Sequence, residues 1–205
     1  MKLVKTDDGS YTYYNEEFDE HYHTKSGAIE EAFEKHVNAL GVEDGMRILD
    51  FCFGLGYNSI AALVNHKNLE VIGIEIDEKI LDKMKRVEVS IEEYEEFREI
   101  KDKKEITDKN NNKIKLIIGD GLKEIKKLKD NYFDRVFFDP FSPKKHPEMW
   151  TEDLFKEVYR VMKDKGKLST YSCARVVRDN MRKAGFEVID GPIVGRRSPS
   201  TIGIK

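Results

Sequence analysis

The 205-residue sequence is poor in cysteine, with only Cys52 and Cys173. Two thiols in or beside predicted strands indicate buried free cysteines in a reducing compartment rather than a disulfide framework. The sequence also lacks any run of about 18 apolar residues, which excludes a membrane-spanning helix, and its first residues lack the apolar core of a secretory signal. We therefore expect a cytoplasmic protein with one domain over residues 1–205, in which residues 1–46 form an N-terminal extension.

Charge is abundant but unevenly distributed. Charged residues make up 37% of the chain, and the formal net charge is −3. Residues 144–205 contain 14 Lys and Arg against 8 Asp and Glu, whereas residues 1–143 have an acidic excess. A basic C-terminal third is typical of proteins that bind a polyanion, although an ordinary solvated surface explains it as well.

The most informative segment is 48–58, Ile-Leu-Asp-Phe-Cys-Phe-Gly-Leu-Gly-Tyr-Asn. An apolar run leads through Asp50 to Gly54 and Gly56, and a helix-compatible stretch follows. This order predicts a strand, a tight turn and a helix whose N-terminus offers free N–H groups to a ligand. The next predicted strand ends at Glu75, 19 residues after Gly56, where a nucleotide-binding fold places its ribose ligand.

The rest of the pattern alternates strands with helices. Strands are predicted at 47–53, 70–75, 115–118, 135–138, 167–172, 186–189 and 201–204. Helices are predicted at 28–40, 57–66, 121–128, 151–162 and 176–184, with a further long helix capped by Asp77. Residues 3–14 indicate a β-hairpin, and the charged residues 98–113 indicate a surface insertion or hairpin tip. We predict an α/β fold with a Rossmann-like, mostly parallel, seven-stranded sheet and an N-terminal hairpin and helix extension.

Acidic residues stand at four predicted strand ends: Asp50, Glu75, Asp120 and Asp139. Because the carboxyl ends of parallel strands meet at one edge of a sheet, these side chains should share a crevice. Each acid could instead cap a helix or a turn.

The same acids bear on the ligand. Ser59 stands where a dinucleotide site has its third glycine, and Asp50 would repel a pyrophosphate. S-adenosylmethionine has an ammonium and a sulfonium but no phosphate, so acidic residues favour it. In this interpretation Asp50 holds the methionine portion, Glu75 the ribose hydroxyls and Asp120 the adenine amino group.

Several segments together resemble a known family. They are 50–58, 139–151 (Asp-Pro-Phe-Ser-Pro-Lys-Lys-His-Pro-Glu-Met-Trp-Thr), 170–174 leading to Val177 and Arg178, 195–197, and upstream 20–24 and 27–32. The layout resembles class I S-adenosylmethionine-dependent methyltransferases. More narrowly, it is similar to the methyltransferase of the MnmC family, which completes 5-methylaminomethyl-2-thiouridine at a tRNA wobble position.

The resemblance implies a set of site residues. It implies binding of S-adenosyl-L-methionine by Glu31, Asp50, Phe51, Gly54, Gly56, Asn58, Glu75, Asp120, Gly121 and Asp139, with Glu31 facing the donor's ammonium. Asp139 is the candidate catalytic residue, which would orient the attacking amine. Pro140 and Phe141 would shape the substrate slot, and the candidates for contact with the tRNA backbone are Lys144, Lys145, Arg175, Arg178, Arg196 and Arg197. Candidates for stacking on a base are Tyr13, Tyr14, Tyr22 and Trp150, for which core packing is the alternative.

Other functions remain open at this point. MnmC proteins are often fused to a flavin-dependent oxidase, and this chain resembles the stand-alone form, so a separate enzyme would supply the aminomethyl group. The alternatives are a methyl- or aminopropyl-transferase acting on a small amine or polyamine, and a non-catalytic RNA-binding module. His21 and His23 share a strand face, but no cysteine or third histidine lies near them in the sequence, so we expect no metal site.

Overall fold

The computed structural model describes residues 1–195 and 197–205. The strands are β1 (Lys2–Lys5), β2 (Tyr11–Asn15), β3 (Glu20–His21), β4 (Arg47–Phe51), β5 (Glu70–Glu75), β6 (Glu105–Thr107), β7 (Lys113–Ile118), β8 (Phe133–Phe138), β9 (Met162–Thr170), β10 (Glu187–Asp190) and β11 (Thr201–Ile204). The helices are α1 (Ala28–Glu31), the π-helix η1 (Ala32–Asn38), α2 (Tyr57–Val64), α3 (Glu78–Met84), α4 (Tyr94–Phe97), α5 (Ile100–Lys103), α6 (Gly121–Glu124), α7 (Glu152–Val161), α8 (Arg175–Lys183) and the short 3-10 helices η2 (Ile125–Lys127) and η3 (Pro147–Trp150). Among the described residues, no helix is long and apolar enough to cross a membrane.

The central sheet has the strand order β10-β11-β9-β8-β4-β5-β7-β6. Its five inner strands from β9 to β7 run parallel. At the edges β6 and β11 run antiparallel to them, and β10 pairs antiparallel with β11. The chain builds outward from β4 through β5 to β7 and then returns to the other side of β4 as β8. The order therefore reverses between β4 and β8, and ligands of open α/β sheets bind at such a switch point.

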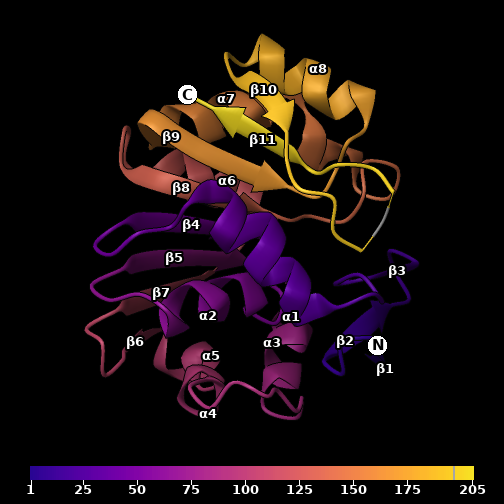
Figure 1. Ribbon diagram of the computed structural model, residues 1–205, viewed down its shortest axis with the longest axis vertical. Coiled ribbons are helices and arrows are strands. Elements are labelled where there is room, and N and C mark those ends of the chain that lie inside the picture. Colours follow the sequence, from indigo (N-terminus) through magenta and orange to yellow (C-terminus); the bar gives the residue numbers. More distant parts are fainter. Residues whose placement is uncertain (196) are drawn as a thin grey trace.

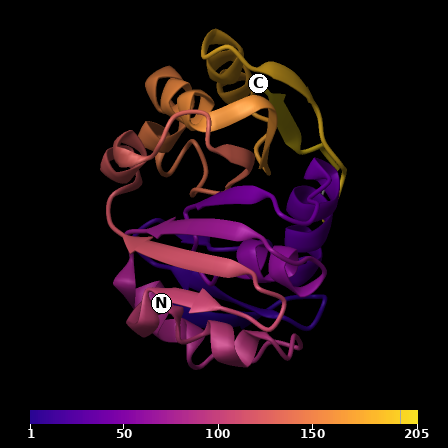
Figure 2. The same cartoon turned by 90° about the vertical axis from the view of Figure 1, so that its left-hand side faces the viewer.

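Helices cover both faces of this sheet (Figures 1 and 2). Ile48 of β4 packs into one apolar cluster, and its neighbour Leu49 packs into the other, because successive strand residues point to opposite faces. Helices α2 and α3 contribute to the first cluster, and helices α7 and α8 to the second.

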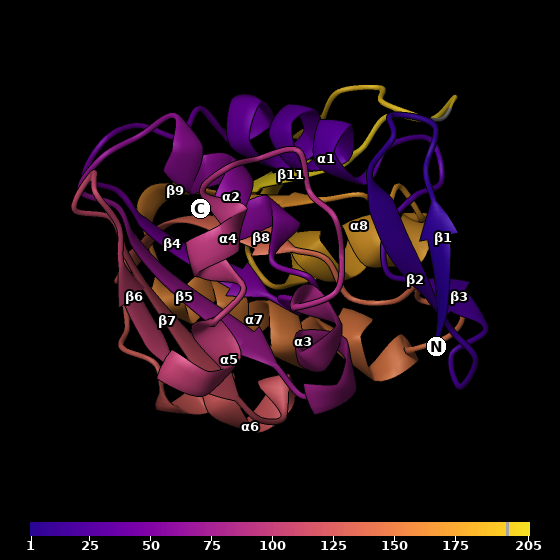
Figure 3. The same cartoon turned by 90° about the horizontal axis from the view of Figure 1, so that it is seen from below.

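A separate sheet of three antiparallel strands, in the order β1-β2-β3, forms the N-terminal part. The predicted hairpin over residues 3–14 is present as β1 paired with β2, and β3 extends it. Figure 3 shows these strands beside one end of the central sheet. This end is the carboxyl end of the parallel strands, so the N-terminal sheet lies over the place where a ligand is expected.

The sequence prediction differs from the structure in, among others, the number of strands in the central sheet, the length of the helix after Asp77 and the form of the helix predicted at 28–40. The central sheet has eight strands instead of seven, because Glu105–Thr107 pairs with β7 inside the stretch interpreted as an insertion; residues 108–112 are the tip of that hairpin. The long helix after Asp77 is only the seven-residue α3, followed by an irregular segment rich in β-branched residues. The predicted helix 28–40 is one turn of α-helix followed by a π-helix, a form that often occurs at functional sites.

Candidate active site

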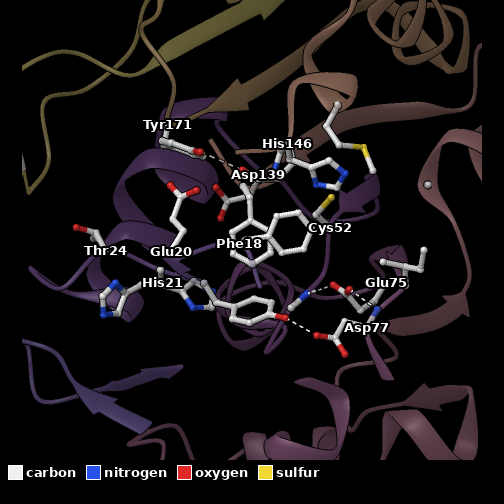
Figure 4. Close-up of a pocket in the computed structure, with 18 of the residues that line it drawn as sticks. Phe18, Glu20, His21, Thr24, Cys52, Glu75, Asp77, Asp139, His146 and Tyr171 are labelled. Atoms are coloured by element: carbon white, nitrogen blue, oxygen red, sulfur yellow. Dashed lines mark hydrogen bonds between the residues drawn. The ribbon is translucent and has the colours of Figure 1, made fainter. Parts of the chain in front are cut away.

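A pocket of about 440 Å³ lies at the carboxyl ends of the central strands, between the sheet and the N-terminal residues 18–25, here called the roof segment (Figure 4). Predicted site residues that line it are Glu31, Gly54, Glu75, Gly121, Asp139, Pro140 and Phe141. Residues from four separate strand ends and from the extension thus meet in one cavity.

The glycine turn after β4 serves two purposes. Gly54 and Gly56 both have left-handed backbones, with φ of 57° and 73°, which glycine adopts without penalty. The Gly54 N–H donates to Glu75 Oε2 at 2.8 Å, so the turn fixes a pocket carboxylate. Gly56 faces away from the pocket contents, since a Cβ there would lie 2.5 Å from the Phe97 ring.

Glu75 is held in one orientation at the end of β5. Besides the Gly54 bond, its Oε1 accepts from the Asp77 N–H at 2.8 Å. Burial raises the pKa of Glu75 to about 7. One backbone donor on each oxygen fixes the carboxylate, and its remaining acceptor sites are available to hydroxyl groups within the cavity.

Asp50 lies beneath the pocket and is fully buried. Ser59 Oγ donates to its Oδ2 at 2.6 Å, whereas Oδ1 has no hydrogen-bond partner among the described residues. Burial raises the pKa of Asp50 to about 8, and the negative charges of Asp139 and Glu75 add to the effect. A buried acid without a countercharge, close to two other acids, fits a cationic ligand above it, because a cation would let these carboxylates ionise.

Asp139 follows β8 and lines the pocket. Its backbone N–H donates to the Phe51 carbonyl at 3.2 Å, and its Oδ2 accepts from Asn58 Nδ2 at 3.4 Å. Glu20, which the roof segment contributes, lines the same pocket (Figure 4). Glu20 is itself oriented by the Ser142 N–H, which donates to its Oε2 at 2.9 Å.

Five predicted cofactor residues do not line the pocket: Asp50, Phe51, Gly56, Asn58 and Asp120. Asp120 caps α6, accepting from the Leu122 N–H at 3.0 Å, so the structure favours the local capping alternative for it. Phe51 underlies Gly121, where a Cβ would lie 2.7 Å from the ring. These residues lie outside the set that lines the cavity.

The roof segment supplies Phe18 and Glu20, to which the sequence assigned no site role, and Tyr22, which it named as a stacking candidate. The Phe18 ring stacks on Phe141 at 4.5 Å between centroids and on His146 at 4.9 Å. The Tyr22 hydroxyl donates to Asp77 Oδ2 at 2.6 Å. Of the four stacking candidates Tyr22 lines the pocket, whereas Tyr13 and Trp150 are core residues. The resemblance of segment 20–24 to a known family was the available signal for this region.

The predicted tRNA-contacting cations fall into different environments. Arg178 is engaged within the protein by Thr201, Asp190 and the Ser200 carbonyl, and Lys145 pairs with Asp19 at 2.8 Å. Lys144 and Arg197 are exposed, and the Arg175 side chain is 95% exposed. Arg196 lies outside the described residues.

Known methyltransferases are similar to this chain over most of its length. Residues 82–205 match a family described as S-adenosyl-L-methionine-dependent methyltransferase. The crystal structure of MnmC2 from Aquifex aeolicus superposes with a TM-score of 0.81 and 31% identity, over 98% of this chain and 69% of that one. An uncharacterized protein of Methanocaldococcus jannaschii is 37% identical over 99% of this chain. The tRNA 5-methylaminomethyl-2-thiouridine biosynthesis bifunctional protein MnmC of Ralstonia nicotianae is 39% identical over 34% of this chain.

These relatives differ from the chain in length. The chain spans 59% of the Methanocaldococcus protein and 10% of the Ralstonia protein.

Proposed function

Because the chain belongs to the S-adenosyl-L-methionine-dependent methyltransferases and is MnmC-like, we propose that it methylates the amine of 5-aminomethyl-(2-thio)uridine at the tRNA wobble position. The family confirms the predicted class of enzyme and the methyl donor. The acceptor is supported by the name of the Ralstonia relative, a tRNA 5-methylaminomethyl-2-thiouridine biosynthesis protein.

The observation on which the proposal rests is the acidic cavity that ends in Asp139. The donor, when bound, supplies a methyl group made electrophilic by a positively charged sulfur. In the proposal Glu75 accepts hydrogen bonds from the ribose hydroxyls, while Glu31 faces the ammonium. Burial raises the pKa values of Asp50 and Glu75, and neighbouring negative charges add to the shift; a bound cation would favour the ionised forms of both acids.

Asp139 is the proposed catalytic residue. The attacking amine has to be neutral and aligned. It would become positively charged as the new N–C bond forms, while the S–CH3 bond breaks and the donor leaves as neutral S-adenosylhomocysteine. A carboxylate fixed by the Asn58 amide can orient the amine by a hydrogen bond and stabilise that charge. Because little net charge is created in the transfer, alignment is the main contribution we assign to the protein.

The acceptor side of the cavity suits a planar ring. Phe141 and Phe18 stack on each other at the wall next to Asp139, and Pro140 also lines the pocket. A nucleobase taken out of its stack finds an aromatic surface here. The exposed cations Lys144, Arg175 and Arg197 are proposed contacts for the tRNA backbone. A separate enzyme that makes the aminomethyl group, and a cytoplasmic setting in line with the two free cysteines, are part of the proposal.

The test compares D139N with the unchanged protein on undermodified tRNA and a labelled methyl donor. We expect D139N to lose turnover by about 100-fold or more, with donor binding retained in isothermal titration calorimetry. D153N is the control, because the Asp153 side chain is 95% exposed on α7.

Nucleoside mass spectrometry then identifies the methylated base. Wild-type turnover by D139N would remove the role of Asp139. Methylation of polyamines with none of tRNA would favour the small-amine alternative.

A further inference from the structure

A buried ion pair lies on the pocket wall formed by the N-terminal extension. Glu31 at the end of α1 and Lys35 in the π-helix η1 both line the pocket. Their side chains are 11% and 2% exposed, and Lys35 Nζ donates to Glu31 Oε1. Glu31 Oε2 accepts from the Thr24 N–H at 3.3 Å.

This pair is incompletely satisfied on the lysine side. An ammonium group has three N–H donors, and within the part of the chain that the structure describes, Lys35 Nζ donates to Glu31 alone. Desolvating two charges costs as much as their attraction returns, or more, unless further hydrogen bonds are made. A buried pair of this kind contributes little to stability by itself, so a ligand that completes it is the better explanation.

Among the basic side chains near this wall of the pocket, Lys35 is the one that is both charged and buried. His23 lines the pocket and His36 lies next to Lys35 in sequence, and burial lowers their pKa values to about 4 and about 3. Both imidazoles are therefore neutral at pH 7. Lys25 also lines the pocket but is exposed to solvent, where a charge is screened.

We propose that Glu31 and Lys35 form the subsite for the amino-acid end of the methyl donor, with Lys35 binding its carboxylate. The amino-acid end of the donor is a zwitterion, with an ammonium and a carboxylate on one carbon. Glu31 would bind the ammonium and Lys35 the carboxylate. The inference rests on the donor chemistry of the family and is independent of the tRNA acceptor.

The subsite gives a physical basis for donor choice. Decarboxylated S-adenosylmethionine, the donor of aminopropyl transfer, keeps the ammonium but has no anion for Lys35. Its binding would leave a desolvated lysine without a new partner, which is costly. Lys35 therefore selects the intact amino acid and disfavours the aminopropyl-transferase alternative.

The experiment measures binding by calorimetry with two probes, S-adenosylhomocysteine and 5′-methylthioadenosine, which lacks the amino-acid end. K35M should bind S-adenosylhomocysteine about 10- to 100-fold more weakly, the range for a hydrogen bond between charged groups. Its affinity for 5′-methylthioadenosine should be unchanged, which also shows that the pocket is folded. K35R should recover part of the loss, and the control K67M, at a lysine that is 67% exposed and lies outside the pocket lining, should bind both probes like the unchanged protein.

A third probe, decarboxylated S-adenosylmethionine, tests the discrimination directly. The preference of the unchanged protein for S-adenosylmethionine over this probe should shrink about 10-fold or more in K35M. If K35M does not fold because Glu31 is left unpaired, the double variant E31Q/K35M removes both charges and is used with the same probes. Wild-type affinity of these variants for S-adenosylhomocysteine, or an equal loss for both adenosine probes, would overturn the proposal. None of these measurements involves tRNA, so a failed acceptor assignment cannot be mistaken for a failed subsite.

Discussion

Replacement of Asp50 by asparagine should stabilise the ligand-free protein, and more so as the pH rises. Asp50 is fully buried, and its pKa is raised from 3.8 to about 8. Between these two values the folded protein holds a proton at this position that the unfolded chain has lost. The stability contributed by the proton is complete below the unfolded pKa and is lost as the pH rises toward the folded pKa.

The size of the effect follows from the width of that window. Each pH unit inside it lowers the free energy of unfolding by about 1.4 kcal/mol. From pH 5 to pH 8 the contribution of Asp50 therefore falls by about 4 kcal/mol. Asparagine does not titrate, and its amide oxygen can still accept the hydrogen bond from Ser59. Glu75 titrates in both proteins and is coupled to Asp50 through its charge, so the comparison measures the loss of the Asp50 charge together with that coupling.

Urea unfolding of both proteins at pH 5, 6, 7 and 8, without donor, measures this difference. The single tryptophan, Trp150, is 2% exposed and reports unfolding by its fluorescence. The advantage of D50N should widen by about 4 kcal/mol across the series, whereas exposed D153N should follow the unchanged protein. Parallel stability curves for D50N and the unchanged protein would refute the assignment of a neutral, buried Asp50.

Two further matched pairs test the structural roles of single residues. Gly56 and Gly45 share a left-handed backbone, with φ of 73° and 77°, so G56A and G45A carry the same backbone penalty. A Cβ at position 56 would lie 2.6 Å from the Phe53 ring, whereas a Cβ at position 45 would have no atom within 4 Å. Urea unfolding should therefore show G56A less stable than G45A by about 2 kcal/mol, and equal losses would contradict the packing argument. R178A should lower stability by about 2 kcal/mol because it breaks the bonds to Thr201 and Asp190, whereas R175A should stay within about 0.5 kcal/mol. R175A should instead weaken tRNA binding and reduce its salt dependence; a stability loss in R175A as large as that of R178A would count against this division of roles.

The sequence was sufficient to predict the central part of the fold. Residues 70–75 and 201–204 form strands with the predicted limits, because short apolar runs bounded by turn residues are strong local signals. The position of Glu75 at the end of β5 followed from that assignment. Strand β6 was missed because three residues between charged stretches give no periodic pattern, and its pairing with β7 determines its structure.

The site was less predictable, since burial and orientation arise from tertiary packing. Asp50 and Asp120 stand at similar places in the sequence pattern, yet one is fully buried beneath the pocket and the other caps a helix. The spacing of Glu31 and Lys35 is visible in the sequence, but an i, i+4 pair on a helix is usually exposed. Only the packing of the extension against the sheet shows that this pair is buried.

The roof segment has a consequence for the order in which the protein is assembled. It is joined to the far side of the pocket by partners more than 120 positions apart, Glu20 with Ser142 and Asp19 with Lys145. Closing so long a loop is entropically costly and slows folding, whereas the β4–β5 pairing joins nearby segments. During synthesis the roof segment therefore cannot close over the pocket until residues beyond 140 have been made. A nascent chain should bind the donor only when more than two thirds of it has been synthesised.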